Sequence, residues 1–196
     1  LLMQYIKYND TTIRNIEIIS DSLHNSSLVS ARYPVRLTGY YAGLIRRPDD
    51  AIWKQCMPDA RELEDHTQCQ DPLDESALSP VHGLIHRYPD RVVLLVSNRC
   101  PVYCRFCMRK RLVGCGDAPM GEEDLHIALK YIAAHPEIHD VILSGGDPLM
   151  LDDASLSKIL SGLRTIPHVA IIRIGTRIPV TFPERITPNL CTLLHK

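Results

Sequence analysis

The sequence has no apolar run that approaches the roughly 18 residues of a membrane-spanning helix, and no membrane span is expected. It also has no excess of basic charge. Lys and Arg number 22 against 23 Asp and Glu, for a net charge of −1, so nucleic acid is not a favoured partner. The first residues, LLMQYIKYND, lack the basic head, apolar stretch and cleavage site of a secretory signal. Position 1 is not methionine, and we expect the chain to begin inside a longer reading frame.

The composition is that of a globular protein, with 45% hydrophobic and 23% charged residues among 196. This length suffices for one core, or for a core with an appended segment. The seven cysteines are an odd number, and three of them fall within eight residues. A secreted disulfide framework spreads its cysteines more evenly in a smaller chain, whereas clustered thiols are typical of metal ligands.

The chain changes character near residue 91. Residues 1–90 are polar and contain many prolines, with weak helical periodicity over Thr12–Leu23 and Ala51–Glu64. The stretch DHTQCQDPLDESALSP at 65–80 is acidic and rich in turn formers, which predicts an extended connector. We therefore expect 1–90 to form a mostly helical and partly extended N-terminal segment.

Residues 91–196 repeat a pattern of strand, loop and helix. The apolar runs predict strands, the first of them buried on both faces of a parallel sheet, and the segments between them have helical periodicity and helix-capping residues. The expected strands are Val92–Val96, Val141–Leu143 and Val169–Ile174; the expected helices are Glu122–Ala134, one capped by Asp152 or Asp153, and one over Thr187–His195. Alternating βα order predicts an α/β fold with a parallel sheet. About three βα units cannot close a barrel, so we expect the first half of a partial (β/α) barrel that is truncated at its C-terminus.

Three cysteines directly follow the first expected strand, in Cys100-Pro-Val-Tyr-Cys104-Arg-Phe-Cys107. A [4Fe-4S] cluster needs four ligands, usually thiolates, and the C-x3-C-x2-C spacing supplies three from one loop. The fourth iron is then open to a small chelating molecule, for which the amino and carboxylate groups of S-adenosylmethionine (SAM) are suited. The alternatives are a zinc site, which usually has four ligands in two separated pairs, or three reduced buried thiols.

At these residues the chain resembles the radical SAM superfamily. It also resembles the lysine 2,3-aminomutase family from about residue 34 to its end, as an N-terminal fragment. The motifs that carry this resemblance are Pro34-Val-Arg36, Asp71-Pro-Leu73, His86-Arg-Tyr-Pro-Asp-Arg91, the three cysteines, Met108-Arg-Lys-Arg111, Ser144-Gly-Gly-Asp-Pro148, Arg173-Ile-Gly-Thr-Arg177 and Arg185-Ile-Thr-Pro188. The resemblance implies a partial barrel of the radical SAM type in 91–196.

The resemblance also assigns residues to SAM. Phe106 would stack near the adenine, and Gly145, Gly146 and Asp147 would bind the methionyl ammonium. Read without the resemblance, Phe106 is a candidate for core packing, and Gly-Gly-Asp-Pro is a turn in which glycine allows close backbone approach.

Four further residues would bind pyridoxal 5′-phosphate (PLP) and substrate. Arg87, Tyr88 and Arg91 match positions that contact PLP, and two guanidiniums with a phenol suit a phosphate. Arg109 matches an arginine that pairs with the substrate α-carboxylate, as the fork of arginine allows. The alternatives are a strand-entry turn with surface charges for the first three, and a solvated basic run for 109–111.

The activity that the resemblance implies is a PLP-dependent 2,3-aminomutase, which moves an α-amino group to the β-carbon through a 5′-deoxyadenosyl radical. The PLP-anchoring lysine and the readers of the substrate side chain would lie beyond residue 196. The expected partners are an amino-acid substrate and an electron donor such as flavodoxin or ferredoxin, in the cytoplasm, with a homo-oligomer left open. The competing functions are a radical SAM enzyme without PLP, and an iron–sulfur or zinc-binding fragment without activity. We also expect the isolated chain to expose its third predicted strand as an apolar edge, and to aggregate or stay partly folded.

Overall fold

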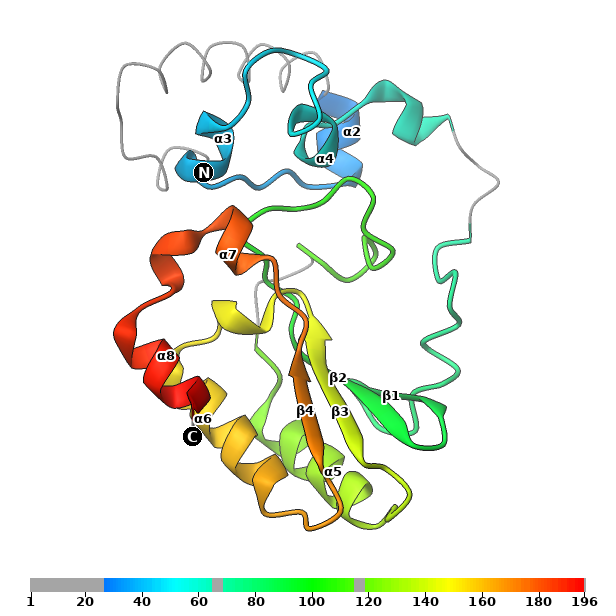
Figure 1. Cartoon of the computed structure of the whole chain (residues 1–196). Helices are drawn as coiled ribbons and strands as arrows, with labels where there is room; N and C mark the ends of the chain where they lie inside the picture. The colour runs from blue at the N-terminus through cyan, green and yellow to red at the C-terminus, as the bar shows by residue number, and fades with distance from the viewer. Residues whose placement is uncertain (1–26, 65–68, 115–118, 196) are drawn as a thin grey trace.

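The computed structural model describes residues 27–64, 69–114 and 119–195 (Figure 1). The helical periodicity noted over Thr12–Leu23 lies outside these residues. No helix in the described part is long and apolar enough to cross a membrane.

A four-stranded sheet forms the centre of the fold, in the order β1 (Leu84–Tyr88), β2 (Arg91–Ser97), β3 (Asp140–Gly145) and β4 (Ile171–Ile174). Strands β2, β3 and β4 are parallel, as the sequence predicts, whereas β1 pairs antiparallel with β2. The sequence reading missed β1, which lies before the expected boundary at residue 90. A two-residue turn, Pro89-Asp90, connects the two strands as a hairpin, and both residues are typical turn formers.

The faces of β2 have different surroundings. Val92, Leu94 and Val96 are at most 1% exposed, while the residues between them are half-buried. The expected burial on both faces is therefore wrong. One face packs on helices, and the side chains of Leu95 and Ser97 border a cavity on the other face.

Three helices cover the buried face of the sheet: α5 (Glu122–Ala133), α6 (Asp153–Arg164) and α8 (Pro188–His195) (Figure 1). Asp152 caps α6, because its carboxylate accepts a hydrogen bond from Ser155 N at 2.8 Å. The apolar face expected for α6 is confirmed, since each of its members is buried. These are Leu156, Ile159, Leu160 and Leu163. With the parallel strands, these helices complete the three βα units of an open partial barrel.

The N-terminal segment forms short helices beside the carboxyl ends of the strands (Figure 1). They are α2 (Ser27–Arg32), α3 (Gly39–Gly43), α4 (Trp53–Cys56) and the 3₁₀ helix η2 (Ala60–Leu63). The helical periodicity over Ala51–Glu64 is thus divided between α4 and η2, with Met57 extended before Pro58. A second core joins this segment to the cysteine loop, because Val102 is buried with Leu37, Tyr41, Ala42, Ile45, Cys56 and Met57.

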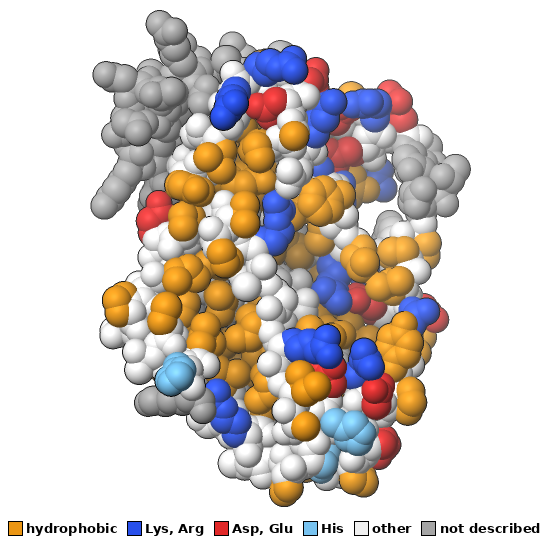
Figure 2. All heavy atoms as spheres, viewed as in Figure 1, with side chains coloured by type: hydrophobic (Ala, Val, Ile, Leu, Met, Phe, Trp, Pro, Cys, Tyr) orange, Lys and Arg blue, Asp and Glu red, His pale blue; other side chains and the backbone are white. Residues whose placement is uncertain are grey.

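Short elements complete the edge beyond β3. They are η3 (Pro148–Met150), α7 (Ile178–Thr181) and η4 (Pro183–Arg185). Strand β4 ends the sheet, and Ile171 on it is 46% exposed. The space-filling view shows the face of the molecule that is turned toward the viewer in Figure 1. Hydrophobic side chains gather across the middle of that face, with Lys and Arg among them (Figure 2). Apolar surface of this kind is typical of regions that contact another surface.

Candidate functional site

The cysteine loop, residues 98–107, begins at the carboxyl end of β2. The residues that follow β3 bond to the start of this loop. Gly146 N donates to Ser97 O at 2.5 Å, and Asp147 N donates to Arg99 O at 2.8 Å. Cys100, Cys104 and Cys107 are free thiols of intermediate burial. The sheet therefore presents all three thiols from one short loop at one end of the barrel.

Hydrogen-bond donors lie beside two of the thiols. The guanidinium of Arg177 contacts Cys104 Sγ, and Arg109 N donates to Cys107 Sγ at 3.4 Å. Burial raises the pKa of the Cys100 thiol to about 12, and the nearby Asp147, Cys107 and Cys104 add to this rise. Burial also raises the pKa of Cys107.

A [4Fe-4S] cluster fits this donor set. Three thiols stand on one loop, and hydrogen-bond donors lie beside two of the sulfurs, as is common around iron–sulfur clusters. Cluster binding would displace the thiol protons, because iron binds thiolates. In the described ranges, no three His, Cys, Asp or Glu side chains gather into a site for a single metal ion.

An ion pair that the sequence analysis did not identify anchors the middle of the loop. Arg105 lies between two of the cysteines and is only 9% exposed. Its Nε and Nη2 donate to the carboxylate of Glu62 at 3.0 and 2.8 Å, and Lys110 Nζ donates to the same carboxylate at 2.5 Å. An arginine between ligand cysteines was the available signal, but its partner lies 43 residues away.

Phe106 is 67% exposed, so the alternative of core packing is wrong. The guanidinium of Arg177 lies over its ring at 5.7 Å from the centroid. An exposed aromatic face beside the cysteines is free for stacking, and adenine contact stays a prediction.

The turn after β3 owes its glycines to close packing within the chain. A Cβ on Gly146 would lie 2.6 Å from Arg99 N, and Gly145 has a φ of +109° with Ser97 O in the path of a Cβ. These glycines do allow a close backbone approach, and the backbone they approach is Ser97–Arg99, where the cysteine loop begins. Their contact with SAM stays a prediction.

Asp147 is 4% exposed and binds the loop after β4. Its Oδ1 accepts from Thr176 Oγ1 at 2.7 Å and from Leu149 N at 3.1 Å, and its Oδ2 accepts from Arg177 N at 2.7 Å. Both oxygens are thus engaged within the chain. This structural role stands beside the expected SAM contact, which is not tested.

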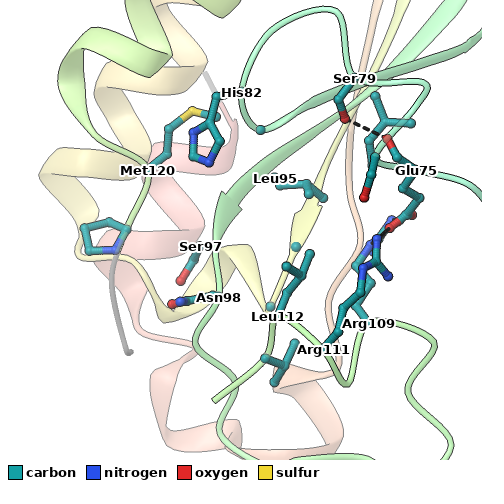
Figure 3. A pocket seen from close by; sticks show the side chains of 17 residues that line it. Glu75, Ser79, His82, Leu95, Ser97, Asn98, Arg109, Arg111, Leu112 and Met120 are labelled. Atoms are coloured by element: carbon teal, nitrogen blue, oxygen red, sulfur yellow. Dashed lines mark hydrogen bonds and ion pairs between the residues drawn. The ribbon is translucent and has the colours of Figure 1, made fainter. Parts of the chain in front are cut away.

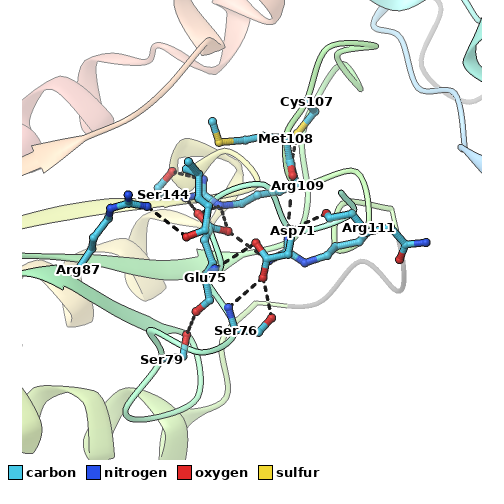
Figure 4. Close-up of polar contacts among 12 residues, drawn as sticks. Asp71, Glu75, Ser76, Ser79, Arg87, Cys107, Met108, Arg109, Arg111 and Ser144 are labelled. Carbon is cyan, nitrogen blue, oxygen red and sulfur yellow. Dashed lines mark hydrogen bonds and ion pairs between the residues drawn. The ribbon is translucent and has the colours of Figure 1, made fainter. Parts of the chain in front are cut away.

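Arg109 does not belong to a solvated run, so that alternative is wrong. Its Nε and Nη2 bond the carboxylate of Glu75 at 2.7 to 3.0 Å, and its Nη1 donates to Ser144 Oγ at 3.2 Å (Figure 4). Arg111 pairs with Asp71 at 2.9 Å. The sequence analysis identified Arg109 but missed Glu75, which lies within the connector.

Arg87, Tyr88 and Arg91 gather at the β1–β2 hairpin. Each guanidinium lies 5.9 Å from the centroid of the Tyr88 ring, which is 55% exposed. The hairpin is at the end of β2 opposite the cysteines, and the seven residues of β2 span ~20 Å. None of the three hairpin residues lines the cavity described below, and their contact with PLP stays a prediction.

A cavity of about 610 Å³ lies on the open face of the sheet (Figure 3). Its wall includes Leu95 from β2, Arg109 just after the cysteine loop, and Gly145 and Gly146 from the turn after β3. Further lining residues are Glu75, Ser79, His82, Ser97, Asn98, Arg111, Leu112 and Met120. This volume is within the range of small-molecule sites. Polar side chains line two sides of the cavity, with Glu75 and Arg109 on one and His82 and Asn98 on the other (Figure 3).

Comparison with known proteins agrees with this geometry. The Radical SAM superfamily matches residues 94–190. An L-lysine 2,3-aminomutase of Fusobacterium nucleatum is 48% identical over 163 residues, which cover 82% of this chain and 38% of that protein. An L-lysine 2,3-aminomutase of Bacillus subtilis is 40% identical over 198 residues, covering 100% of this chain and 42% of its own length. A glutamate 2,3-aminomutase of Clostridioides difficile is 37% identical, with 95% of this chain and 45% of that protein covered.

The chain thus spans less than half the length of these relatives. The matched region contains the second half of β2, the cysteine loop, β3 with the turn after it, and β4. Members of this superfamily use a [4Fe-4S] cluster and SAM, in agreement with three thiols on one loop. The sheet, the loop and the relatives together show that this chain belongs to the radical SAM superfamily.

Proposed function

We propose that the full-length protein that carries this chain is a PLP-dependent amino-acid 2,3-aminomutase, which shifts an α-amino group to the β-carbon. The observation that carries the proposal is the position of Arg109, which lines the cavity beside Gly145 and follows the last cysteine by two residues. The names of the relatives support the same reaction class.

The residues of this chain have distinct tasks in the proposed reaction. Cys100, Cys104 and Cys107 would hold the cluster. Arg109 would bind the substrate carboxylate, since its guanidinium offers two parallel donors. When bound, the cluster and SAM supply a radical that removes hydrogen, and PLP supplies a carrier for the migrating amino group. The cavity would enclose the substrate and exclude water.

The other side chains would set the position of the cofactors. Phe106 would contact the adenine, and Gly145, Gly146 and Asp147 would border the methionyl group of SAM. Arg87, Tyr88 and Arg91 would bind the phosphate of PLP, because two guanidiniums and a phenol can donate to a dianion. An electron donor of the flavodoxin or ferredoxin type, in the cytoplasm, completes the proposal.

Anaerobic reconstitution of the full-length protein tests this function. We expect a reduced [4Fe-4S] electron paramagnetic resonance signal that changes on addition of SAM. We also expect β-amino-acid product from L-lysine or L-glutamate only when PLP is present. A SAM-dependent signal with no need for PLP would instead favour a different radical SAM enzyme. A cluster indifferent to SAM would refute the proposal.

A further inference from the structure

The connector before β1 places a buried carboxylate against Arg109 (Figure 4). Glu75 is 5% exposed, and its two oxygens bond Nε and Nη2 of Arg109. These two nitrogens form the side edge of the guanidinium. The contact joins residues that are 34 positions apart, so it depends on the fold.

A rigid turn holds Glu75 in this place. The Asp71 carboxylate accepts from Glu75 N at 3.1 Å, from Ser76 N at 3.0 Å and from Ser76 Oγ at 2.9 Å. Ser79 Oγ donates to Glu75 O at 2.8 Å. These bonds fix the main chain of Glu75 at its N and O atoms, so that its side chain leaves the turn beside Arg109.

The turn also contacts two further arginines, Arg111 and Arg87. Arg111 Nη2 bonds Asp71 at 2.9 Å and Glu75 at 3.4 Å, and Arg87 Nη1 donates to Leu73 O at 3.2 Å. Arg109 and Arg111 thus share the two carboxylates of Asp71 and Glu75. One short segment thus touches both the arginine assigned to the substrate and one assigned to PLP.

The remaining edge of Arg109 points away from Glu75. Its Nη1 donates to Ser144 Oγ at the end of β3, and the next residue, Gly145, lines the same cavity as Arg109. Glu75 therefore occupies the Nε and Nη2 edge of the guanidinium, and a carboxylate that enters the cavity can bind only to the edge formed by Nη1 and Nη2. Two parallel hydrogen bonds to that edge fix one orientation of the substrate.

We propose that Glu75 is a positioning residue that locks the Arg109 guanidinium in one orientation and so sets how the amino-acid carboxylate binds. This inference rests on the proposed function, in which Arg109 binds that carboxylate. A lock of this kind lowers the cost of ordering the long arginine side chain when substrate arrives.

Charge alone predicts the opposite effect, which makes the inference testable. Replacing Glu75 by the neutral Gln leaves Arg109 and Arg111 with one counter-charge fewer, and a simple attraction would then bind a carboxylate more tightly. A positioning role predicts weaker binding, because glutamine keeps only one acceptor oxygen and its NH2 group cannot accept a hydrogen bond from Arg109.

The experiment compares Glu75→Gln, Arg109→Gln and the double variant in the reconstituted full-length protein, with L-lysine as the probe. We expect Glu75→Gln to raise KM about tenfold with kcat within about twofold, and to weaken L-lysine binding in equilibrium dialysis with SAM by a similar factor. In the Arg109→Gln background it should have no further effect on binding, as expected when one residue acts through the other.

The matched control is Asp153→Asn, which removes a carboxylate from another arginine pair, with Arg185 at 2.6 Å, at the N-terminus of α6. It should leave KM unchanged. A Glu75→Gln protein with lower KM would show that Glu75 competes with substrate, and unchanged KM or additive losses in the double variant would show a purely structural role. Each of these results overturns the inference. If the unaltered protein neither binds nor converts L-lysine or L-glutamate, the proposed function itself fails.

The variant must first be shown to fold. Its cluster content and its electron paramagnetic resonance signal with SAM should equal those of the unaltered protein. If Glu75→Gln does not take up the cluster, Glu75→Asp replaces it, since that variant keeps the charge but shortens the side chain by one methylene. A KM for Glu75→Asp equal to that of the unaltered protein would then contradict the need for an exact Arg109 orientation.

Discussion

Adding one methyl group at Gly146 should displace the start of the cysteine loop and so weaken cluster binding. A Cβ there would lie 2.6 Å from the nitrogen and 2.7 Å from the carbonyl carbon of Arg99. Both atoms belong to backbone, so no side-chain rotation relieves the overlap, and the root of the cysteine loop must move. Overpacking of a tight interior site typically costs about 1–3 kcal/mol. We expect Gly146→Ala to lose stability in that range and to bind less iron after reconstitution.

The assay is chemical unfolding of the protein together with iron and sulfide content. Gly175→Ala is the matched control, because Gly175 also follows a parallel strand but its added Cβ would meet Leu143 O at an ordinary 3.5 Å. The control should keep its stability and its iron content. A Gly146→Ala protein that matches the unaltered one in both measurements would refute the packing argument.

Three further expectations concern stability and assembly. Burial acts to raise the pKa of Glu62, but hydrogen bonds from Arg105, Lys110 and Asp59 N outweigh it, and the pKa lies below its usual value. Glu62 therefore stabilises the fold above the unfolded pKa of about 4.3, and this stabilisation is lost as pH falls through the folded pKa. Glu62→Gln should lower the free energy of unfolding at pH 7. Unfolding curves at lower pH should show the difference between the variant and the unaltered protein disappear. Leu163 is 0% exposed, so Leu163→Ala should cost about 2–5 kcal/mol in urea unfolding, and a loss under about 1 kcal/mol would contradict the packing. The isolated chain should aggregate through β4, which a monomeric, cooperative melt in solution would disprove.

Local patterns were sufficient to predict the parallel part of the sheet. The apolar runs at β2 and β3, the cap at Asp152 and the inner face of α6 are short-range features, and each was found where periodicity placed it. Strand β1 was missed because its five residues, LIHRY, do not alternate between apolar and polar. It becomes a strand by pairing with β2 across a turn.

The sequence predicted the cysteines that would bind the cluster, but it did not predict the residues that hold the cysteine loop and Arg109 in place. Three cysteines on one loop are visible as a motif, since all the information lies within eight residues. The carboxylates that hold the loop and its arginine, Glu62 and Glu75, are 43 and 34 residues away from their partners. Sequence spacing contains no distance information of that kind. The segment at 65–80 was predicted only as an extended connector, yet it contains the buried ion-pair partner Glu75.

The contacts of Arg177 also constrain the order in which the protein can assemble. This arginine reaches Cys104, Gln55 and Tyr41, which precede it by 73, 122 and 136 residues. During synthesis the three cysteines therefore leave the ribosome long before the guanidinium that contacts them. Contacts across such separations form late, because a long loop must close first. The nascent chain thus presents the Cys104 thiol without its arginine partner until β4 and the loop after it have been made, and in that interval the thiol is open to iron delivery or to oxidation.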